Sequence, residues 1–204
     1  MIYLDNAATT YPKPFSVLET VYRANRKYAY NSGRGGYRES VQTAEKIFAV
    51  RDCLGRFFHC PEQNIVFTNN CTTAVNTALK GLLKPGDHVL ISALEHNAVF
   101  RPIYKLAREG RITYDLVPYH PDPNRFLQNI RALEQPNTAM VAMLHASNVF
   151  GVVHPLGLVG DYCRRKGWLF VVDAAQSAGI LPIDMQAMHI SALCAPGHRR
   201  AGAG

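Results

Sequence analysis

The stretch WLFVVDAAQS, residues 168–177, decides the expected fold. Its apolar run has the length of a strand and stops at Asp173, and the amide of Gln176 follows after two small residues. This pattern is typical of a buried parallel strand with polar groups at its carboxyl end. In open α/β sheets, ligands bind at that edge. The alternative is that Asp173 only caps a following helix and that Gln176 faces solvent.

The rest of the chain repeats a rhythm of strand, loop and helix. Strands are predicted at 65–67, 88–91, 113–117, 139–144, 169–172 and 192–194. Helices are predicted at about 15–28, 39–58, 72–83, 97–108, 124–133 and 156–165. This alternation predicts an α/β fold, a mainly parallel sheet flanked by helices. Residues 1–14 contain two prolines and predict an irregular arm before a body that spans 15–204.

Composition limits the class of protein. The 204 residues are 48% hydrophobic and 18% charged, which is typical of a soluble globular domain. No apolar run approaches the roughly 20 residues that cross a bilayer, and the start lacks the basic and apolar regions of a signal peptide. We therefore expect a cytoplasmic protein that does not enter a membrane.

Charge and cysteine content argue against two further classes. The net charge is +7, but the basic residues are dispersed, so nucleic-acid binding is not favoured and anionic small ligands fit equally well. The five cysteines have no C-x-x-C spacing, which predicts neither a disulfide framework nor a metal site. Reduced and mostly packed thiols are the simpler interpretation.

Several polar residues fall where strands end or helices begin. Thr72 and Thr73 open a helix, where backbone N–H groups can hold an anion, although threonine also caps helices without a ligand. His96 could stack on an aromatic ligand or simply start a helix, and Asn148 has room to reach into a cleft. The glycine-rich loop at 33–36 could approach a ligand or serve as a plain connector.

Taken together, these segments resemble the class V aminotransferase family of pyridoxal-phosphate enzymes, in its cysteine desulfurase and selenocysteine lyase branch. The likeness is carried by YLDNAATT at 3–10, GRG at 33–35, FT at 67–68, TTAVN at 72–76, EH at 95–96, HASN at 145–148, VDAAQS at 172–177 and GH at 197–198. The resemblance implies the pyridoxal-phosphate fold type I, of which this chain would be the N-terminal part of the large domain.

The resemblance also implies a role for each site residue. Asp173 would keep the pyridine nitrogen of pyridoxal 5'-phosphate protonated, and His96 would stack on the ring. The remaining cofactor-binding positions are Asn148 and Gln176 at the ring oxygen, Thr72 and Thr73 at the phosphate, and His198 in the Gly-His motif. The family reaction would convert cysteine to alanine and leave sulfur on the enzyme. A homodimer and a sulfur-acceptor protein are implied partners.

Two departures from the family pattern change the expectation. Arg199 stands where the family has the lysine that forms the Schiff base, and a guanidinium does not lose its proton usefully. Pro196 replaces a phosphate-binding serine found in many relatives, and the tail RAGAG does not continue the family pattern. We expect a truncated chain without the small C-terminal domain, with exposed apolar surface and no intact catalytic residue.

Other functions stay open at this stage. Within the family, the alternatives are an aminotransferase or another lyase that uses the same cofactor. Outside catalysis, the alternative is a remnant of the fold that binds pyridoxal phosphate or nothing. A basic nucleic-acid binder is a third class, and it would show steeply salt-dependent binding to DNA.

Overall fold

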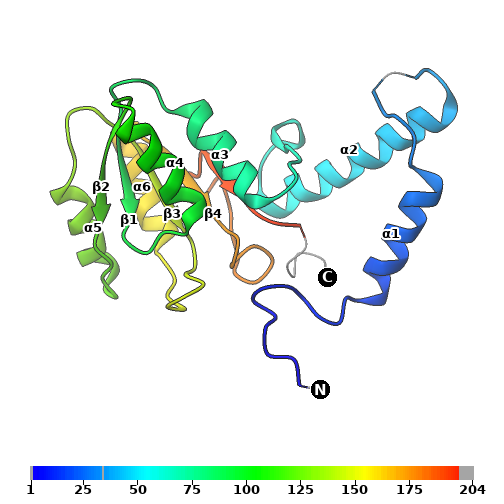
Figure 1. Ribbon diagram of the computed structural model, residues 1–204, viewed down its shortest axis with the longest axis horizontal. Helices are drawn as coiled ribbons and strands as arrows, with labels where there is room; N and C mark the ends of the chain where they lie inside the picture. The colour runs from blue at the N-terminus through cyan, green and yellow to red at the C-terminus, as the bar shows by residue number, and fades with distance from the viewer. Residues whose placement is uncertain (1, 34, 198–204) are drawn as a thin grey trace.

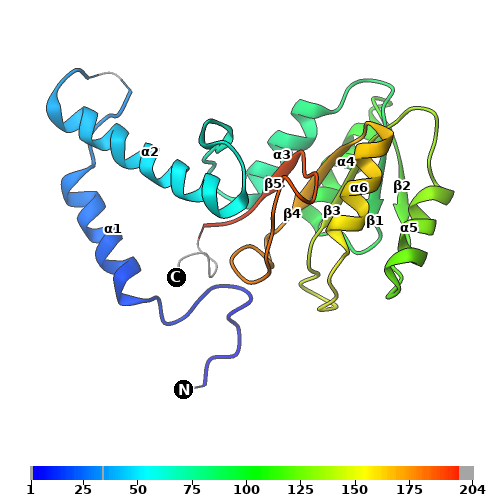
Figure 2. The same ribbon diagram turned by 180° about the vertical axis from the view of Figure 1, so that it is seen from behind.

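A computed structural model describes residues 2–33 and 35–197. Its centre is a sheet of five parallel strands in the order β2-β1-β3-β4-β5. The strands are β1 His88–Ser92, β2 Thr113–Val117, β3 Thr138–Leu144, β4 Leu169–Asp173 and β5 Ala192–Cys194. Figures 1 and 2 show helices on both faces of this sheet. The predicted α/β class with a parallel sheet is confirmed.

Alternating side chains along the strands build two separate cores. Leu90, Val141 and Phe170 pack on one face against helices α5 Pro123–Ala132 and α6 Leu156–Lys166. On the other face, Val89, Met140 and Val171 pack against α3 Cys71–Leu82 and α4 Asn97–Arg108. Because both faces of the sheet are covered, the central strands read as nearly continuous apolar runs.

Local signals fix where the helices start and stop. Asn70 caps α3 by accepting a hydrogen bond from the Thr73 backbone N–H at 2.8 Å. Asp122 caps α5 in the same way, with proline at the first helical position. Helix α6 ends at Gly167, whose φ of 72° is the left-handed conformation that glycine adopts most readily. The helix ends therefore lie within two residues of the predicted ones.

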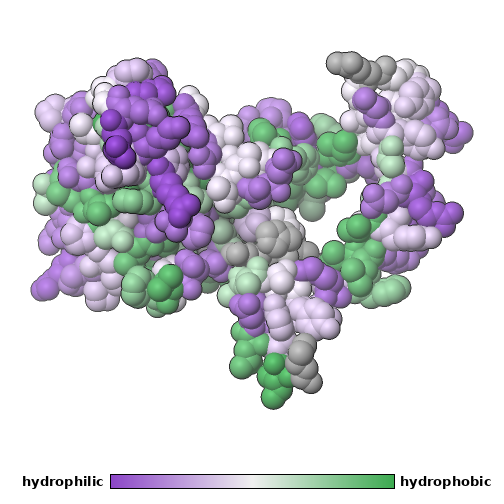
Figure 3. Space-filling view, in the orientation of Figure 1, coloured by the Kyte–Doolittle hydropathy of each residue, from purple (hydrophilic) through white to green (hydrophobic). Residues whose placement is uncertain are grey.

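Helices α1 Phe15–Lys27 and α2 Arg38–Phe58 project away from the sheet, as Figures 1 and 2 show. Helix α1 contains no buried residue, and the side chains of Phe15, Leu18 and Tyr22 are all more than half exposed. Apolar surface on this side of the molecule is visible in Figure 3. The expectation of exposed apolar surface is met on these two helices.

The predicted strand at 65–67 is not formed, and that prediction was wrong. A short 3-10 helix, η1 Glu62–Asn64, precedes an extended segment in which Val66 is 75% and Phe67 50% exposed. A strand needs a hydrogen-bonded neighbour, and no described strand pairs with this segment. The apolar pattern alone could not reveal the missing neighbour.

The cysteines are less buried than predicted. Cys163 and Cys194 are buried, Cys60 and Cys71 are half-buried and Cys53 is exposed. The prediction that the thiols are mostly buried was therefore too strong.

Within residues 2–33 and 35–197, none of the helices is both long enough and apolar enough to span a bilayer.

Candidate functional site

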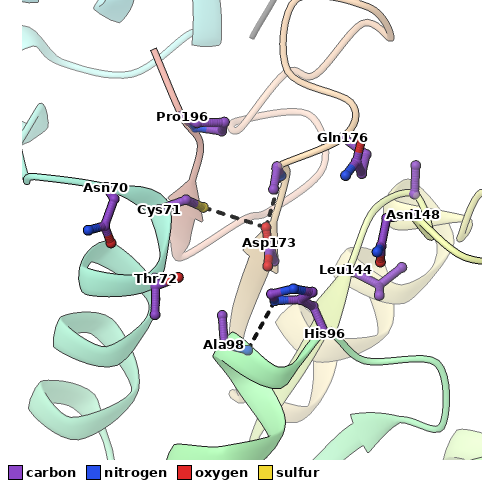
Figure 4. A pocket seen from close by; sticks show the side chains of 12 residues that line it. Asn70, Cys71, Thr72, His96, Ala98, Leu144, Asn148, Asp173, Gln176 and Pro196 are labelled. Carbon is purple, nitrogen blue, oxygen red and sulfur yellow. Dashed lines mark hydrogen bonds between the residues drawn. The ribbon is translucent and has the colours of Figure 1, made fainter. Parts of the chain in front are cut away.

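A pocket with a volume of about 190 Å³ lies at the carboxyl ends of the strands. The strand order reverses between β1 and β3, because β1 continues to β2 on one side of it while β3 lies on the other. Such a switch point opens a crevice outside the strand ends. The pocket is lined by Asn70, Cys71, Thr72, His96, Ala98, Leu144, Ala146, Asn148, Asp173, Ala175, Gln176 and Pro196, most of which are labelled in Figure 4.

Asp173 is the buried acid of this pocket. It ends β4 and is only 5% exposed. Its Oδ1 accepts a hydrogen bond from the Ala175 backbone N–H at 2.9 Å and one from Cys71 Sγ at 3.6 Å. The local bond from Ala175 resembles the capping role considered above, but a turn follows Asp173 rather than an α-helix. Both contacts hold the carboxylate in a fixed orientation at the pocket wall.

His96 forms another wall of the pocket. It is the N-cap of α4, and its Nδ1 accepts a hydrogen bond from the Ala98 backbone N–H at 3.1 Å. In a neutral ring, Nε2 then carries the hydrogen. Figure 4 shows the His96 ring on the same side of the pocket as the Asp173 carboxylate. His96 therefore starts a helix and also lines the pocket, and its stacking on a ligand stays a prediction.

The start of α3 contributes a positive helix end. The first N–H groups of a helix have no carbonyl partner within it, so they favour an anion. Thr72 lines the pocket, but Thr73 does not. The Thr73 backbone N–H and Oγ1 both donate to Asn70 Oδ1, at 2.8 and 3.1 Å. The structure therefore brings one of the two predicted threonines to the pocket and places the other in the helix cap.

Asn148 and Gln176 supply amides from two different loops. Asn148 follows β3 in a turn where Ser147 Oγ accepts hydrogen bonds from the next backbone N–H groups, at 3.3 and 3.2 Å. Gln176 lies in the turn after β4, and Figure 4 shows the two residues on the same side of the pocket. Leu144 and the buried Pro196 add apolar wall.

Five predicted site residues thus line one pocket: Thr72, His96, Asn148, Asp173 and Gln176. His198 and Arg199 lie outside the described residues, as does Arg34 of the glycine-rich loop. Gly33 and Gly35 belong to the connection between α1 and α2 and do not line the pocket, and the role of their loop stays open. Residues 3–10 do not line the pocket either.

Two residues next to the pocket, Cys71 and Glu95, had no predicted role in the site. Cys71 was interpreted only as one of five scattered thiols, yet it contacts Asp173. Glu95 accepts hydrogen bonds from Ser92 Oγ and the Leu144 backbone N–H, each at 2.7 Å. The available signals were the place of Cys71 at a helix start and the place of Glu95 next to His96.

Burial controls the protonation of groups around the pocket. Burial raises the pKa of the Glu95 carboxyl to about 8, opposed by its hydrogen bonds from Ser92 and Leu144 and increased further by the charge of Asp173. Burial, together with the charge of Asp173, raises the pKa of the Cys194 thiol to about 12. The raised pKa values favour the neutral forms of the Glu95 carboxyl and the Cys194 thiol.

The pocket combines a buried carboxylate, a flat ring, two amides and a helix start. This set suits a small aromatic ligand that carries an anionic group at one end and a nitrogen cation at the other. In the described part of the chain, no group of three or more metal-ligating side chains is found. The fold and the pocket define a parallel α/β protein with a small-ligand site at the topological switch point.

Comparison with known proteins specifies the family. The family model for class V aminotransferases matches residues 2–204, and the chain belongs to this family. Cysteine desulfurase IscS of Shewanella baltica strain OS223 is 33% identical over 209 residues, which cover 98% of this chain and 51% of that protein. IscS of Shewanella oneidensis is 34% identical with the same coverage. The chain spans about half the length of these curated relatives.

Solved structures agree in fold. The apo cysteine desulfurase of Thermococcus onnurineus NA1 has a TM-score of 0.87 and 29% identity, over 98% of this chain and 50% of that one. SspA in complex with cysteine has a TM-score of 0.87 and 27% identity, over 99% of this chain and 58% of its own length. The five-stranded parallel sheet with its flanking helices is thus the pyridoxal-phosphate fold type I of these neighbours.

Proposed function

We propose that this chain carries the cofactor-binding half of a cysteine desulfurase-like site and binds pyridoxal 5'-phosphate noncovalently. The observation that carries the proposal is the convergence of Asp173, His96, Asn148 and Gln176 on one pocket beside the start of α3. Relatives named cysteine desulfurase, and a similar structure solved with cysteine, support a cysteine-like substrate for the whole protein.

The residues present fit this cofactor. The buried Asp173 carboxylate suits a protonated ring nitrogen, because an opposite charge offsets the cost of burying either group alone. The beginning of α3, with Thr72, suits the phosphate, and His96 offers a flat face to the ring. Asn148 and Gln176 offer amide groups to the ring oxygen. Pro196 offers no hydroxyl, so the phosphate contacts depend more strongly on α3.

When bound, pyridoxal phosphate supplies an electron sink for bonds broken in an amino-acid substrate. The chain's own residues would orient it and set its charge: Asp173 holds a proton at the ring nitrogen and His96 fixes the ring plane. These positioning roles do not require an amine from the protein.

We further propose that the 204-residue chain releases no sulfide from cysteine. By the family resemblance, Arg199 would stand at the position of the Schiff-base lysine, and its guanidinium would stay protonated at any physiological pH. The cytoplasmic location expected from the sequence, and the homodimer and sulfur-acceptor protein implied by the family resemblance, remain predictions.

Titration of the purified chain with pyridoxal phosphate, followed by equilibrium dialysis, tests the binding proposal. Saturable binding at one site per chain is expected. After dialysis has removed excess cofactor, borohydride treatment should leave no stoichiometric pyridoxyl group on any single lysine when peptides are analysed by mass spectrometry. Absence of saturable binding would refute the proposal, and sulfide release at a rate typical of the family would refute the inactivity.

The Arg199→Lys variant is the matched comparison. It restores the amine at the family position and leaves every pocket residue unchanged. Borohydride should then trap a pyridoxyl group on residue 199 in this variant but not in the unchanged chain. If both chains trap the group on the same other lysine, the assignment of position 199 is wrong.

A further inference from the structure

Glu95 connects β1 and β3, the two strands that flank the switch point, through hydrogen bonds. Its Oε1 accepts one hydrogen bond from Ser92 Oγ at the end of β1 and another from the Leu144 backbone N–H at the end of β3, each at 2.7 Å. Glu95 directly precedes His96, and Leu144 lines the pocket. The carboxyl group therefore fastens the loop that carries His96 to the neighbouring strand.

The second oxygen of this carboxyl group is in a different situation. Oε2 is buried and has no hydrogen-bond partner among the described residues, although Glu95 as a whole is only partly buried. A buried carboxylate oxygen without a partner is far more costly than the same oxygen in a neutral acid. The unpartnered Oε2 thus favours a protonated Glu95, whereas the two donors to Oε1 favour the charged form.

The charged surroundings act in the same direction. Asp173, at the end of β4, is the neighbouring acid whose charge disfavours ionisation of Glu95, and burial has the larger effect. Ser92 from β1 and the Leu144 N–H from β3 stabilise the charged form, but they do not outweigh burial. Two carboxylates at one sheet edge would also compete for a cationic ligand.

We propose that Glu95 is a positioning residue that keeps its proton in the folded chain, holds the His96 loop against β3, and leaves Asp173 as the charged carboxylate of the pocket. The link to the cofactor rests on the function proposed above. The protonation of Glu95 and its hydrogen bonds do not depend on that function.

The proposal predicts how cofactor affinity depends on pH. Below about pH 8, Glu95 is neutral and Asp173 alone faces the cofactor's ring nitrogen. As the pH rises through about 8, Glu95 becomes charged, its unpartnered oxygen becomes costly, and the loop that carries His96 loosens. Affinity for pyridoxal phosphate should therefore fall above that pH through this residue.

A titration without cofactor tests the protonation directly. The chain is labelled with ¹³C at the glutamate carboxyl carbons, and the Glu95 signal is assigned by its loss in Glu95→Gln. The signal should be that of a neutral acid at pH 7 and should titrate near pH 8. A Glu95 signal that titrates near the ordinary glutamate value of 4.5 in the folded chain would overturn the proposal.

A binding series tests the positioning role. Glu95→Gln keeps the shape of the side chain and is neutral like the protonated acid, so its affinity for pyridoxal phosphate at pH 7 should stay within about twofold of that of the unchanged chain. The affinity of this variant should not fall above pH 8. Glu95→Ala removes both hydrogen bonds and should bind about tenfold more weakly. Glu109→Gln, on an exposed carboxyl paired with Lys105, is the control and should behave like the unchanged chain.

The outcomes separate the two proposals. If Glu95→Gln weakens the binding of pyridoxal phosphate at pH 7 as much as Glu95→Ala does, the charge of Glu95 matters and the positioning proposal is wrong. If the unchanged chain does not bind pyridoxal phosphate, the proposed function falls, while the carboxyl titration still decides whether Glu95 holds its proton.

Discussion

Cys71 Sγ lies 3.6 Å from Oδ1 of Asp173, so the first residue of α3 contacts the acid at the end of β4. These residues are 102 positions apart in the sequence. The contact joins the helix start that suits a phosphate to the carboxylate that suits a ring nitrogen. It also makes Cys71 a natural probe of the pocket.

Pyridoxal phosphate should protect Cys71 from alkylation. N-ethylmaleimide is expected to label the exposed Cys53 and the half-buried Cys71, and bound cofactor should slow only the labelling of Cys71. Mass spectrometry of the two peptides measures both rates in one sample. Cys53 is the internal control. An unchanged Cys71 rate at saturating cofactor would place the ligand elsewhere.

Removing the charge of Asp173 should weaken cofactor binding. Asp173→Asn keeps the size of the side chain but loses the ion pair with a protonated ring nitrogen, so affinity should fall by about ten- to hundredfold. Equilibrium dialysis measures the change. Asp52→Asn, in an exposed pair with Arg56, is the matched control and should bind normally. Equal affinity of the Asp173 variant and the unchanged chain would contradict the assigned role.

Much of the fold could be predicted from sequence because its strands are buried and its helices carry clear end signals. The run at 169–172 and the helix at 97–108 illustrate this, since each apolar pattern matches one element. The segment at 65–67 has the same apolar character but lacks a described neighbour strand. Whether a segment pairs as a strand depends on the neighbouring strands of the sheet, and the apolar pattern of the segment itself does not indicate this.

The pocket was predictable for a related reason. Parallel strands bring their carboxyl ends to one edge, so Asp173, Asn148 and His96 had to meet. The contact of Cys71 with Asp173 and the bridge made by Glu95 depend on the relative placement of side chains from different elements. The bond from the Thr73 N–H to Asn70 is different, because asparagine is a preferred N-cap and the residue three positions later donates to it, so local sequence did indicate this cap.

Gly160 in α6 should tolerate no larger residue. A Cβ added there would overlap the carbonyl group of Met188 and crowd the ring of Phe170. Gly160→Ala should therefore lower the free energy of unfolding by about 1 to 3 kcal/mol, despite the better helix propensity of alanine. Urea denaturation followed by circular dichroism measures this change.

Gly157, one turn earlier in the same helix, is the matched control. A Cβ at that position meets nothing within 4 Å. Gly157→Ala should leave stability unchanged or raise it by up to about 1 kcal/mol. Equal destabilisation by both substitutions would show that α6 does not pack against the segment around Met188 as described.

His154 should make the folded chain sensitive to acid. The residue is 1% exposed, its ring packs against Tyr119 and Phe126, and neither ring nitrogen has a hydrogen-bond partner among the described residues. Burial, with a smaller effect of the charge of His145, lowers the pKa of His154 from 6.5 to about 4. Between these values the unfolded chain binds a proton that the folded chain does not, so stability falls as the pH drops from 6.5 to 4.

Replacing His154 with leucine should remove this part of the pH dependence. The free energy of unfolding of the unchanged chain should fall by about 3 kcal/mol more than that of His154→Leu between pH 6.5 and 4. Urea denaturation at several pH values measures both curves. His59→Asn replaces an exposed histidine in a left-handed backbone position that asparagine tolerates, and it should keep the acid sensitivity of the unchanged chain. Parallel curves for His154→Leu and the unchanged chain would mean that His154 is protonated without cost in the fold.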